Sequence, residues 1–304
     1  MPSCGLIGTI TADTIEVDNG RTFRSVGGIL YQAAVLCGLG VSTVLLSHCG
    51  ESLRSEVEAI VGEWPVLDRR GLTYVPGPGN RVLLRYSERS REREEILESV
   101  VPPHDPESIL RALPGLDFLF MVFNSGFDIS LPDWRAVADR AACPIWVDIH
   151  SLVLSPCVGA RRDYRAIPDW RDWVEGADYL QANRREAACL MGRPEREADE
   201  TEIRELCGQA FQIGVRAVFV TLGKEGVLAA VPGDIRRLPV RAAVKTVDPT
   251  GCGDVFAAAA ARGLLRGQPV FQAASAGVDL ASHAAGISGI PETYLLASRA
   301  GKDF

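Results

Sequence analysis

Short apolar segments alternate with longer helical segments along most of the chain. Residues 118–123, 145–150, 179–182 and 217–221 are predicted strands, and helices are predicted between them. A strand that is followed by a crossover helix returns parallel to its neighbour, with the helix covering one face of the sheet. The sequence therefore predicts an α/β fold with a mainly parallel, helix-covered sheet.

Composition limits the kinds of partner. The chain has 304 residues and a net charge of −7, which disfavours nucleic acid as an obligate partner because phosphate binding normally requires a basic face. The eight cysteines show no CxxC spacing and the four histidines are dispersed, so we expect reduced thiols and no zinc site. The Arg- and Glu-rich residues 88–95 are expected to form a solvated loop or helix face.

The sequence also predicts a location. No signal peptide precedes the first apolar segment, and no apolar run reaches the roughly 18–20 residues that span a bilayer. Together with the reduced cysteines, this predicts a cytoplasmic protein with no membrane partner.

A glycine turn near the C-terminus carries the strongest chemical signal. Residues 248–254 are Asp-Pro-Thr-Gly-Cys-Gly-Asp, and an Ala-rich helical segment follows. Gly251 and Gly253 allow a tight turn whose N–H groups attract an anion, and Asp254 beside them suggests a general base. This pairing suits phosphoryl transfer to a hydroxyl. The alternative is an ordinary turn in which the aspartate caps the helix.

Two N-terminal segments suggest a ligand site. Asp13 stands at the end of the first predicted strand, where open α/β sheets bind ligands, although a turn aspartate is the simpler interpretation. Gly27 and Gly28 precede an apolar helix that contains Gln32. The two glycines either let the backbone approach a ligand or form a tight turn.

Two later segments also follow predicted strands. Asn183 and Glu186 have the spacing of a capping box, or they orient Mg²⁺ through water. Thr221, Gly223 and Gly226 form a glycine turn that either contacts nucleotide phosphate or is a plain β-turn.

The pattern changes to short alternating strands between residues 65 and 86. Residues 72–75 and 81–86 flank a Pro-Gly-Pro-Gly turn, which predicts a small antiparallel flap. Because the flap is inserted between βα units, it is a candidate lid at about residues 65–100 rather than a separate domain.

Taken in order, these segments resemble the PfkB (ribokinase-like) family of carbohydrate and nucleoside kinases over nearly the whole chain. The family's D-T-x-G-A-G-D motif corresponds to residues 248–254, its N-x-x-E motif to Asn183 and Glu186, and its T-x-G-x-x-G motif to residues 221–226. The resemblance implies a ribokinase-like three-layer sandwich, with one kinase domain over residues 1–304 and a small antiparallel β lid.

The resemblance also implies a role for each motif residue. Asp254 would deprotonate the acceptor hydroxyl, and Gly251, Cys252 and Gly253 would form the anion hole. The acceptor would be bound by Asp13, Gly27, Gly28 and Gln32, and the nucleotide by Asn183, Thr221, Gly223 and Gly226. ATP would be the donor, with Mg²⁺ held through water by Glu186 and a monovalent cation such as K⁺ near Asp248 and Thr250. In many members the lid pairs two subunits, so a homodimer is expected.

Three positions depart from the family pattern. Gln32 stands where most sugar kinases have asparagine, which changes the contact to the acceptor. Cys252 replaces alanine and would be sensitive to thiol reagents if the turn lowers its pKa. Pro249, together with the strand end at residues 147–150, resembles the plant myo-inositol kinase branch.

The sequence leaves three functions open. The preferred one is ATP-dependent phosphorylation of a hydroxyl on a small sugar or cyclic polyol beneath a lid that excludes water. A nucleoside kinase is the second, with Tyr74 or Tyr86 of the flap stacking on a base. A catalytically inactive ligand-binding homologue is the third, and the presence of Asp254 with both glycines argues against it.

Overall fold

A large sheet forms the centre of the computed structural model, which describes residues 1–17, 21–86, 93–241 and 244–303. The strand order is β14-β13-β12-β11-β10-β9-β1-β4-β5, and β6 also pairs with β4. The strands are β1 (Ser3–Ile7), β4 (Ser42–Gly50), β5 (Leu67–Asp68), β6 (Leu72–Val75), β9 (Phe118–Val122), β10 (Ile145–Asp148), β11 (Tyr179–Asn183), β12 (Ala217–Thr221), β13 (Val227–Val231) and β14 (Asp234–Leu238). All pairings are parallel except β12–β13 and β13–β14, which confirms the mainly parallel sheet.

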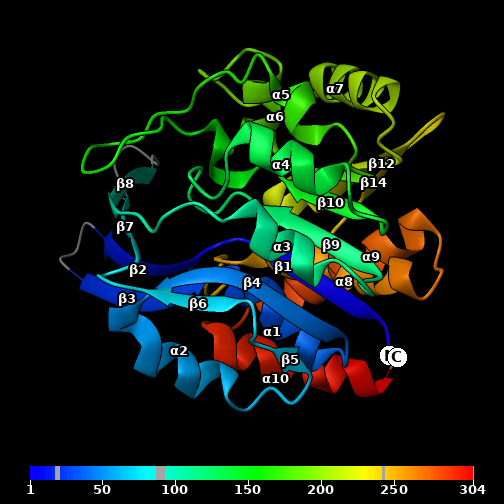
Figure 1. Ribbon diagram of the computed structural model, residues 1–304. Helices are drawn as coiled ribbons and strands as arrows, with labels where there is room; N and C mark the ends of the chain where they lie inside the picture. Colours follow the sequence, from blue (N-terminus) through cyan, green and yellow to red (C-terminus); the bar gives the residue numbers. More distant parts are fainter. Residues whose placement is uncertain (18–20, 87–92, 242–243, 304) are drawn as a thin grey trace.

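Helices cover both faces of this sheet, as Figure 1 shows. One face is packed by α1 (Leu30–Gly38), α2 (Arg54–Val61), α8 (Cys252–Leu265), α9 (Val270–Ala284) and α10 (Ile290–Asp303). The other is packed by α3 (Pro106–Ala112), α4 (Leu131–Ala138), α5 (Trp170–Val174), α6 (Arg184–Leu190) and α7 (Glu200–Gln212). Short 3₁₀ helices are η1 (Glu51–Leu53), η2 (His150–Val153) and η3 (Gly223–Glu225). Because each helix buries an apolar face against the sheet, the result is the predicted three-layer sandwich.

The Ala-rich sequence of α8 explains its central place. The alanines at 257–261 are all buried, and small side chains let the helix pack closely against both α1 and α9. This packing fixes the N-terminus of α8, which carries the glycine turn, at one end of the sheet.

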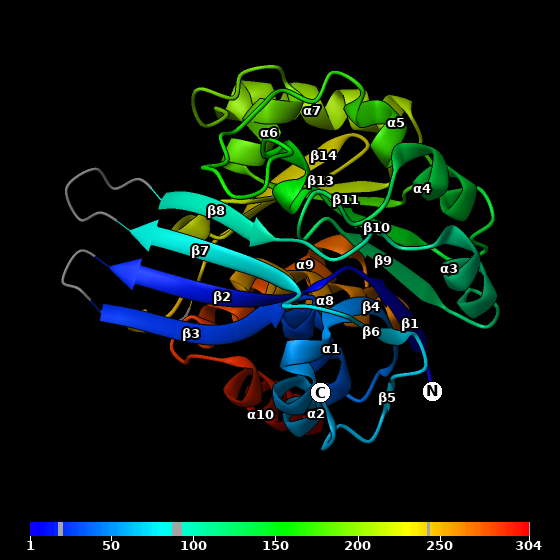
Figure 2. The same cartoon turned by 60° about the vertical axis from the view of Figure 1, so that its left-hand side comes forward.

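A second sheet of four strands forms the lid. Its order is β3-β2-β7-β8, with β2 (Ile10–Val17), β3 (Arg21–Gly28), β7 (Asn80–Tyr86) and β8 (Arg93–Ser99). The pairs β2–β3 and β7–β8 are antiparallel, and β2–β7 is parallel. Figure 2 shows these strands projecting together from the helical body.

The strands that form the lid differ from those of the predicted flap. β6 pairs with β4 of the main sheet, so residues 72–75 do not belong to the lid, and β7 pairs instead with β2 and β8. The solvated loop or helix face predicted for residues 88–95 is wrong for Glu95, which is buried in β8. The part of that prediction at residues 88–92 lies outside the described residues.

A buried polar network joins the lid to the body. Asn80, at the start of β7, donates from Nδ2 to Thr9 Oγ1 at 2.6 Å and accepts at Oδ1 from the Val101 N–H at 2.7 Å. Thr9 in turn donates to Asp128 Oδ1 at 3.0 Å. The network thus connects the entry and the exit of the lid to the loop after β9.

Among the described helices, none has the length and apolar character needed to cross a membrane.

Candidate active site

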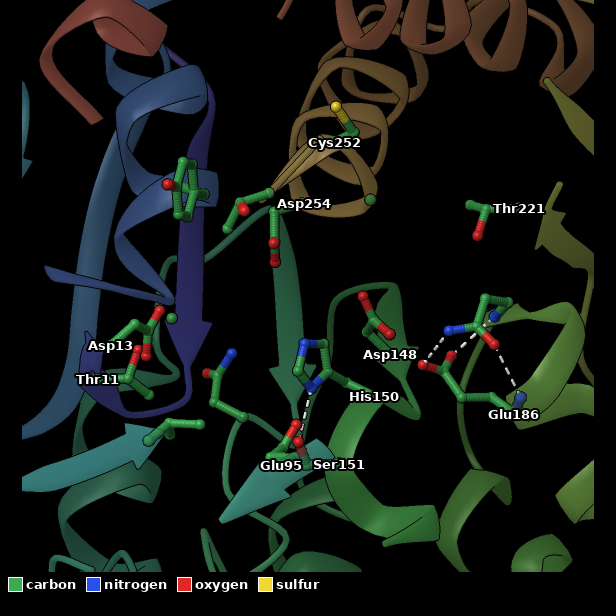
Figure 3. Close-up of a pocket in the computed structure, with 18 of the residues that line it drawn as sticks. Thr11, Asp13, Glu95, Asp148, His150, Ser151, Glu186, Thr221, Cys252 and Asp254 are labelled. Carbon is green, nitrogen blue, oxygen red and sulfur yellow. Dashed lines mark hydrogen bonds between the residues drawn. The ribbon is translucent and has the colours of Figure 1, made fainter. Parts of the chain in front are cut away.

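A polar cavity of about 330 Å³ lies where the lid meets the carboxyl ends of the central strands. The lid contributes Thr11, Asp13, Val82, Leu84 and Glu95. The central strands and the loops after them contribute Asn124, Asp148, His150, Gln181 and Asn183, and the glycine turn with the start of α8 contributes residues 249–254. Figure 3 shows Asp254 between the lid side, with Asp13, and the sheet side, with Asp148 and Glu186. This is the edge at which open α/β sheets bind ligands.

The turn before α8 has the predicted conformation. Gly251 is the helix N-cap with φ +75°, and a Cβ atom there would lie 2.4 Å from the Tyr31 ring, so a residue with a side chain would both clash and be strained. Gly251 has no side chain with which to cap the helix, and Asp254 is the third residue of α8. The N–H groups in the first turn of a helix lack intrahelical acceptors, and they are the natural donors to an anion.

The carboxylate of Asp254 lies at the cavity with one oxygen buried. Its Oδ1 atom is buried and has no hydrogen-bond partner among the described residues. Burial, and secondly the charge of Asp148, raise the pKa of Asp254 well above its usual range. A carboxyl group that is largely withdrawn from water takes up a proton more readily than an exposed aspartate does.

Gln181 connects Asp148 to the glycine turn. Its Nε2 atom donates to Asp148 Oδ2 at 2.9 Å and to the Gly253 carbonyl oxygen at 3.1 Å. Burial, followed by the charge of Glu186, raises the pKa of Asp148. Carboxylates from α8, β10 and α6 thus converge on one cavity, and their mutual repulsion raises the affinity of the site for protons and for cations.

Some of the N-terminal residues predicted to bind the acceptor lie at the polar cavity. Asp13 and Gly28 line the cavity. Gly28 has φ +65°, and a Cβ atom at Gly27 would lie 2.7 Å from Asp13 Oδ2. The two glycines therefore let the backbone ahead of α1 pass directly beside the carboxylate of Asp13.

Gln32 is not at the cavity. It is fully buried in α1 and absent from the cavity lining, and its amide nitrogen and oxygen have no hydrogen-bond partner within the described part of the chain. The side chain that extends into the cavity from this helix is Tyr31. Gln32 therefore lies behind the cavity wall rather than at the place where its predicted contact to the acceptor would be.

A second cavity of about 930 Å³ adjoins the first. It contains the predicted donor residues Asn183, Thr221, Gly223 and Gly226, and its apolar wall includes Val227, Val240, Phe256, Val278 and Ala281. Six residues line both cavities: Tyr164, Asn183, Thr221, Pro249, Cys252 and Gly253. The glycine turn thus lies between a polar cavity and a cavity with an apolar wall.

Asn183 and Glu186 form the capping box at the start of α6. Asn183 Oδ1 accepts from the Glu186 N–H at 2.9 Å, and Glu186 Oε2 accepts from the Asn183 N–H at 2.7 Å. Both residues nevertheless line the polar cavity. Among the described residues, no group of three metal-ligating side chains occurs.

The start of the glycine turn is held by Asp248. Its Oδ1 atom accepts from the Thr250 N–H at 2.9 Å, and its Oδ2 atom accepts from the Ser288 hydroxyl at 2.7 Å.

Burial, with the charges of Asp248 and Asp254, raises the pKa of Cys252 to about 11. The premise that the turn lowers this pKa is wrong, because an anion hole that faces carboxylates does not stabilise a thiolate.

Several cavity residues were not assigned a role from the sequence. Asp148 ends β10 and Asn124 follows β9 by two residues, so the rule that ligands bind at strand ends would have found both. Gln181 lies within β11. His150 has φ +35°, a strained conformation of the kind that clusters at functional sites, and its Nδ1 lies 2.9 Å from Ser151 Oγ.

The position of Glu95 depends on a residue far away in sequence. Arg162 Nη1 lies 3.3 Å from Glu95 Oε1, with both side chains almost fully buried. The Arg162 N–H also donates to the Glu95 carbonyl oxygen at 2.8 Å. The two residues thus connect β8 to the loop after η2. No local sequence pattern indicates this contact.

Comparisons with known proteins agree with this architecture. Residues 141–291 match the family model described as pfkB family carbohydrate kinase. A ribokinase from Schizosaccharomyces pombe is 32% identical over 106 residues, which are 34% of this chain and 33% of that protein. The chain therefore matches only a third of the length of this curated relative.

Solved structures resemble the whole fold. A pyrophosphate-dependent kinase in the ribokinase family, complexed with a pyrophosphate analog and myo-inositol, superposes with a TM-score of 0.77 at 18% identity, over 98% of this chain and 100% of that one. Arabidopsis thaliana ribokinase, complexed with ribose and ATP, gives a TM-score of 0.73 at 19% identity, over 98% of this chain and 99% of that one.

Fold and comparisons together define the class, a mixed α/β protein with the ribokinase fold. Over residues 141–291 the chain is similar to the PfkB (ribokinase-like) carbohydrate kinases, in agreement with the resemblance of its sequence motifs.

Proposed function

We propose that this protein transfers the terminal phosphoryl group of ATP to a hydroxyl of a small sugar or cyclic polyol. The observation that carries the proposal is the position of Asp254 and the glycine turn between a polar cavity and a partly apolar one. An alcohol in the first and a nucleotide in the second would meet at this turn, as in-line transfer requires.

In this mechanism Asp254 takes the proton of the attacking hydroxyl as the oxygen–phosphorus bond forms. The N–H groups of residues 251–253 stabilise the negative charge on the migrating phosphoryl group. The bond from phosphorus to the bridging oxygen of ATP breaks, and ADP remains in the donor cavity. The raised pKa of Asp254 supports the role of base, because an ordinary aspartate is a weak proton acceptor at neutral pH.

The lining of the first cavity favours a polyhydroxylated acceptor. Asp13 and Glu95 supply carboxylates from the lid and Asn124 supplies an amide from the sheet end, while Val82 and Leu84 offer apolar surface to carbon atoms of a ring. Hydrogen-bonding groups on several sides suit a sugar or polyol. Related kinases have been solved with ribose and with myo-inositol, which supports the same class.

A nucleoside acceptor is less well supported. Tyr74 does not line the cavity: its hydroxyl donates to Glu58 at 2.8 Å, and Arg54 lies over its ring. The side chain of Tyr86, the other predicted stacking residue, lies outside the described ones. Tyr31 and Tyr164 do line the cavity, so nucleosides remain the second acceptor class to be assayed.

The donor side supports a nucleotide with Mg²⁺. The apolar wall around Val227, Phe256 and Val278 suits a purine base, and Thr221 with Gly223 lies where phosphates would follow. Mg²⁺ would reach Glu186 through water and neutralise phosphate charge.

A monovalent cation such as K⁺ is proposed beside Asp248 and Thr250. We treat residues 1–304 as one kinase domain whose lid also pairs two subunits.

A phosphorylation assay tests the proposal. Purified protein is given ATP or pyrophosphate with Mg²⁺ and a panel of sugars, cyclic polyols and nucleosides, and phosphorylated product is measured by mass spectrometry. We expect turnover with ATP and at least one sugar or polyol. Turnover confined to nucleosides would refute the acceptor class, and ligand binding with no turnover on any acceptor would identify an inactive homologue.

A further inference from the structure

The side chain of Arg185 contacts a residue that the two cavities share, and it takes no part in the capping box. It lies in the first turn of α6 and lines the donor cavity. Its guanidinium carbon lies 4.8 Å from the centre of the Tyr164 ring. The Nε atom of Arg185 is buried and has no hydrogen-bond partner within the described segments.

Tyr164 supports this guanidinium from another part of the chain. It belongs to the segment after η2, and its backbone forms an isolated antiparallel bridge with Leu154. Its side chain is one of those that line both cavities. A guanidinium stacked on an aromatic face keeps its in-plane N–H donors available to another ligand.

A cation beside the donor phosphates would offset the negative charge of the site. The carboxylates of Asp254, Asp148 and Glu186 all line the acceptor cavity beside the glycine turn, and each repels a phosphate chain placed there. Phosphoryl-transfer sites offset this repulsion with metal ions and with fixed Arg or Lys side chains. A buried guanidinium nitrogen with no protein partner gains most from an anionic ligand.

We propose that Arg185, held in place by the Tyr164 ring, binds the phosphate chain of the phosphoryl donor. Within the proposed kinase function, on which this inference rests, Arg185 is a donor-binding residue and Tyr164 is its positioning residue. The ligand chemistry is a diphosphate linkage, which occurs both in a nucleotide and in inorganic pyrophosphate.

The neighbouring arginine provides a matched control. Arg184 Nη2 lies 3.3 Å from Glu225 Oε2, so Arg184 already has an ionic partner. Replacing Arg184 or Arg185 by Gln removes the same charge from adjacent positions of α6. A difference between the two variants therefore reports the specific contact rather than the general potential of the site.

Calorimetric titration tests the inference without requiring turnover. Inorganic pyrophosphate and ADP, each with Mg²⁺, are titrated into the full chain and into variants whose thermal unfolding matches that of the wild type. For Arg185→Gln we expect both ligands to bind about 10- to 100-fold more weakly, the usual effect of losing hydrogen bonds to a charged group. Arg184→Gln should change binding by less than about 3-fold, which is under 1 kcal/mol.

The Tyr164 variants test the positioning role. Tyr164→Phe keeps the ring and should bind both ligands as the wild type does. Tyr164→Leu removes the cation–π contact and should weaken binding by about 3- to 30-fold. Equal loss in the Phe and Leu variants would overturn the role of the ring.

Other outcomes separate this inference from the proposed function. Wild-type protein that binds neither ligand, Arg185→Gln that binds both normally, or an equal loss in Arg184→Gln would each overturn it. Weakened donor binding in Arg185→Gln alone supports it, even if no acceptor is phosphorylated and the proposed activity is refuted. Comparing the two ligands shows whether the nucleoside moiety contributes to affinity.

Discussion

Replacing Gln32 by Met tests whether the buried amide in α1 is a structural cost or a ligand contact. Gln32 is completely buried, and neither polar atom of its amide has a partner among the residues that the structure describes. Burying an amide without hydrogen bonds costs roughly 1–3 kcal/mol in proteins. Met has a similar length and volume, so it should fill the same space with little rearrangement.

We therefore expect Gln32→Met to raise the free energy of unfolding by about 1–2 kcal/mol, the lower part of that cost, because some repacking strain offsets the gain. Since Gln32 does not line the acceptor cavity, KM for the acceptor should change by less than about 2-fold, or 0.4 kcal/mol. Urea denaturation gives the first quantity, and initial rates at saturating donor give the second.

Gln32→Asn is the matched control, because it keeps the amide and removes one methylene. It leaves both the unpartnered group and a small void, and it should be less stable than the wild type by about 1 kcal/mol. A destabilised Gln32→Met, or an acceptor KM raised by about 10-fold, would refute this reasoning. Either result would mean that the amide binds water or the acceptor in the working enzyme.

Four further predictions concern catalysis, pH and assembly. Asp254→Asn should lower turnover by about 10²- to 10⁴-fold, the usual effect of losing a general base, and leave calorimetric ADP binding unchanged; a near-normal rate would remove its role. Asp148→Asn should move the acid limb of the pH–rate profile to lower pH, because the charge of Asp148 helps to raise the pKa of Asp254; an unmoved or raised limb contradicts this. Burial lowers the pKa of His104 from 6.5 to about 3, so the unfolded chain binds more protons between these values and stability falls as the pH drops below about 6.5. At pH 5 the loss should be about 2 kcal/mol, and His104→Gln should remove that part of the pH dependence in urea titrations. Phe23 on β3 is 53% exposed, and Phe23→Ser should convert lid-paired dimers into monomers in light scattering, whereas a monomeric wild type would refute the dimer.

The chemical motifs were predictable because each is local. The motifs at residues 248–254, 183–186 and 221–226 each stand at the start of a helix or at a tight turn. In each motif the residues that shape the backbone are therefore neighbours in sequence of the residues that carry the chemistry. The parallel sheet was predictable for the same reason, since each βα unit is a continuous segment.

The lid was not predictable because its pairings join distant segments. β2 follows β1 after only Gly8 and Thr9, so the alternating pattern of one sheet continues into the other and looks like a single strand. β6 has the same alternation as β7 but finds its partner in β4. Register between strands far apart in sequence depends on tertiary packing, which a propensity pattern does not contain.

Glu95 shows why the acceptor is harder to infer than the reaction. Its side chain belongs to an Arg- and Glu-rich segment that looks solvated, whereas the buried guanidinium of Arg162 offsets its charge at the cavity. The groups proposed for phosphoryl transfer lie on α8 and at the ends of the main sheet, whereas Thr11, Asp13 and Glu95 reach the cavity from the lid. A sequence can therefore keep every motif of the transfer reaction while the lid contacts change the alcohol it accepts, and exchange of Glu95 should alter acceptor preference before it alters the chemistry.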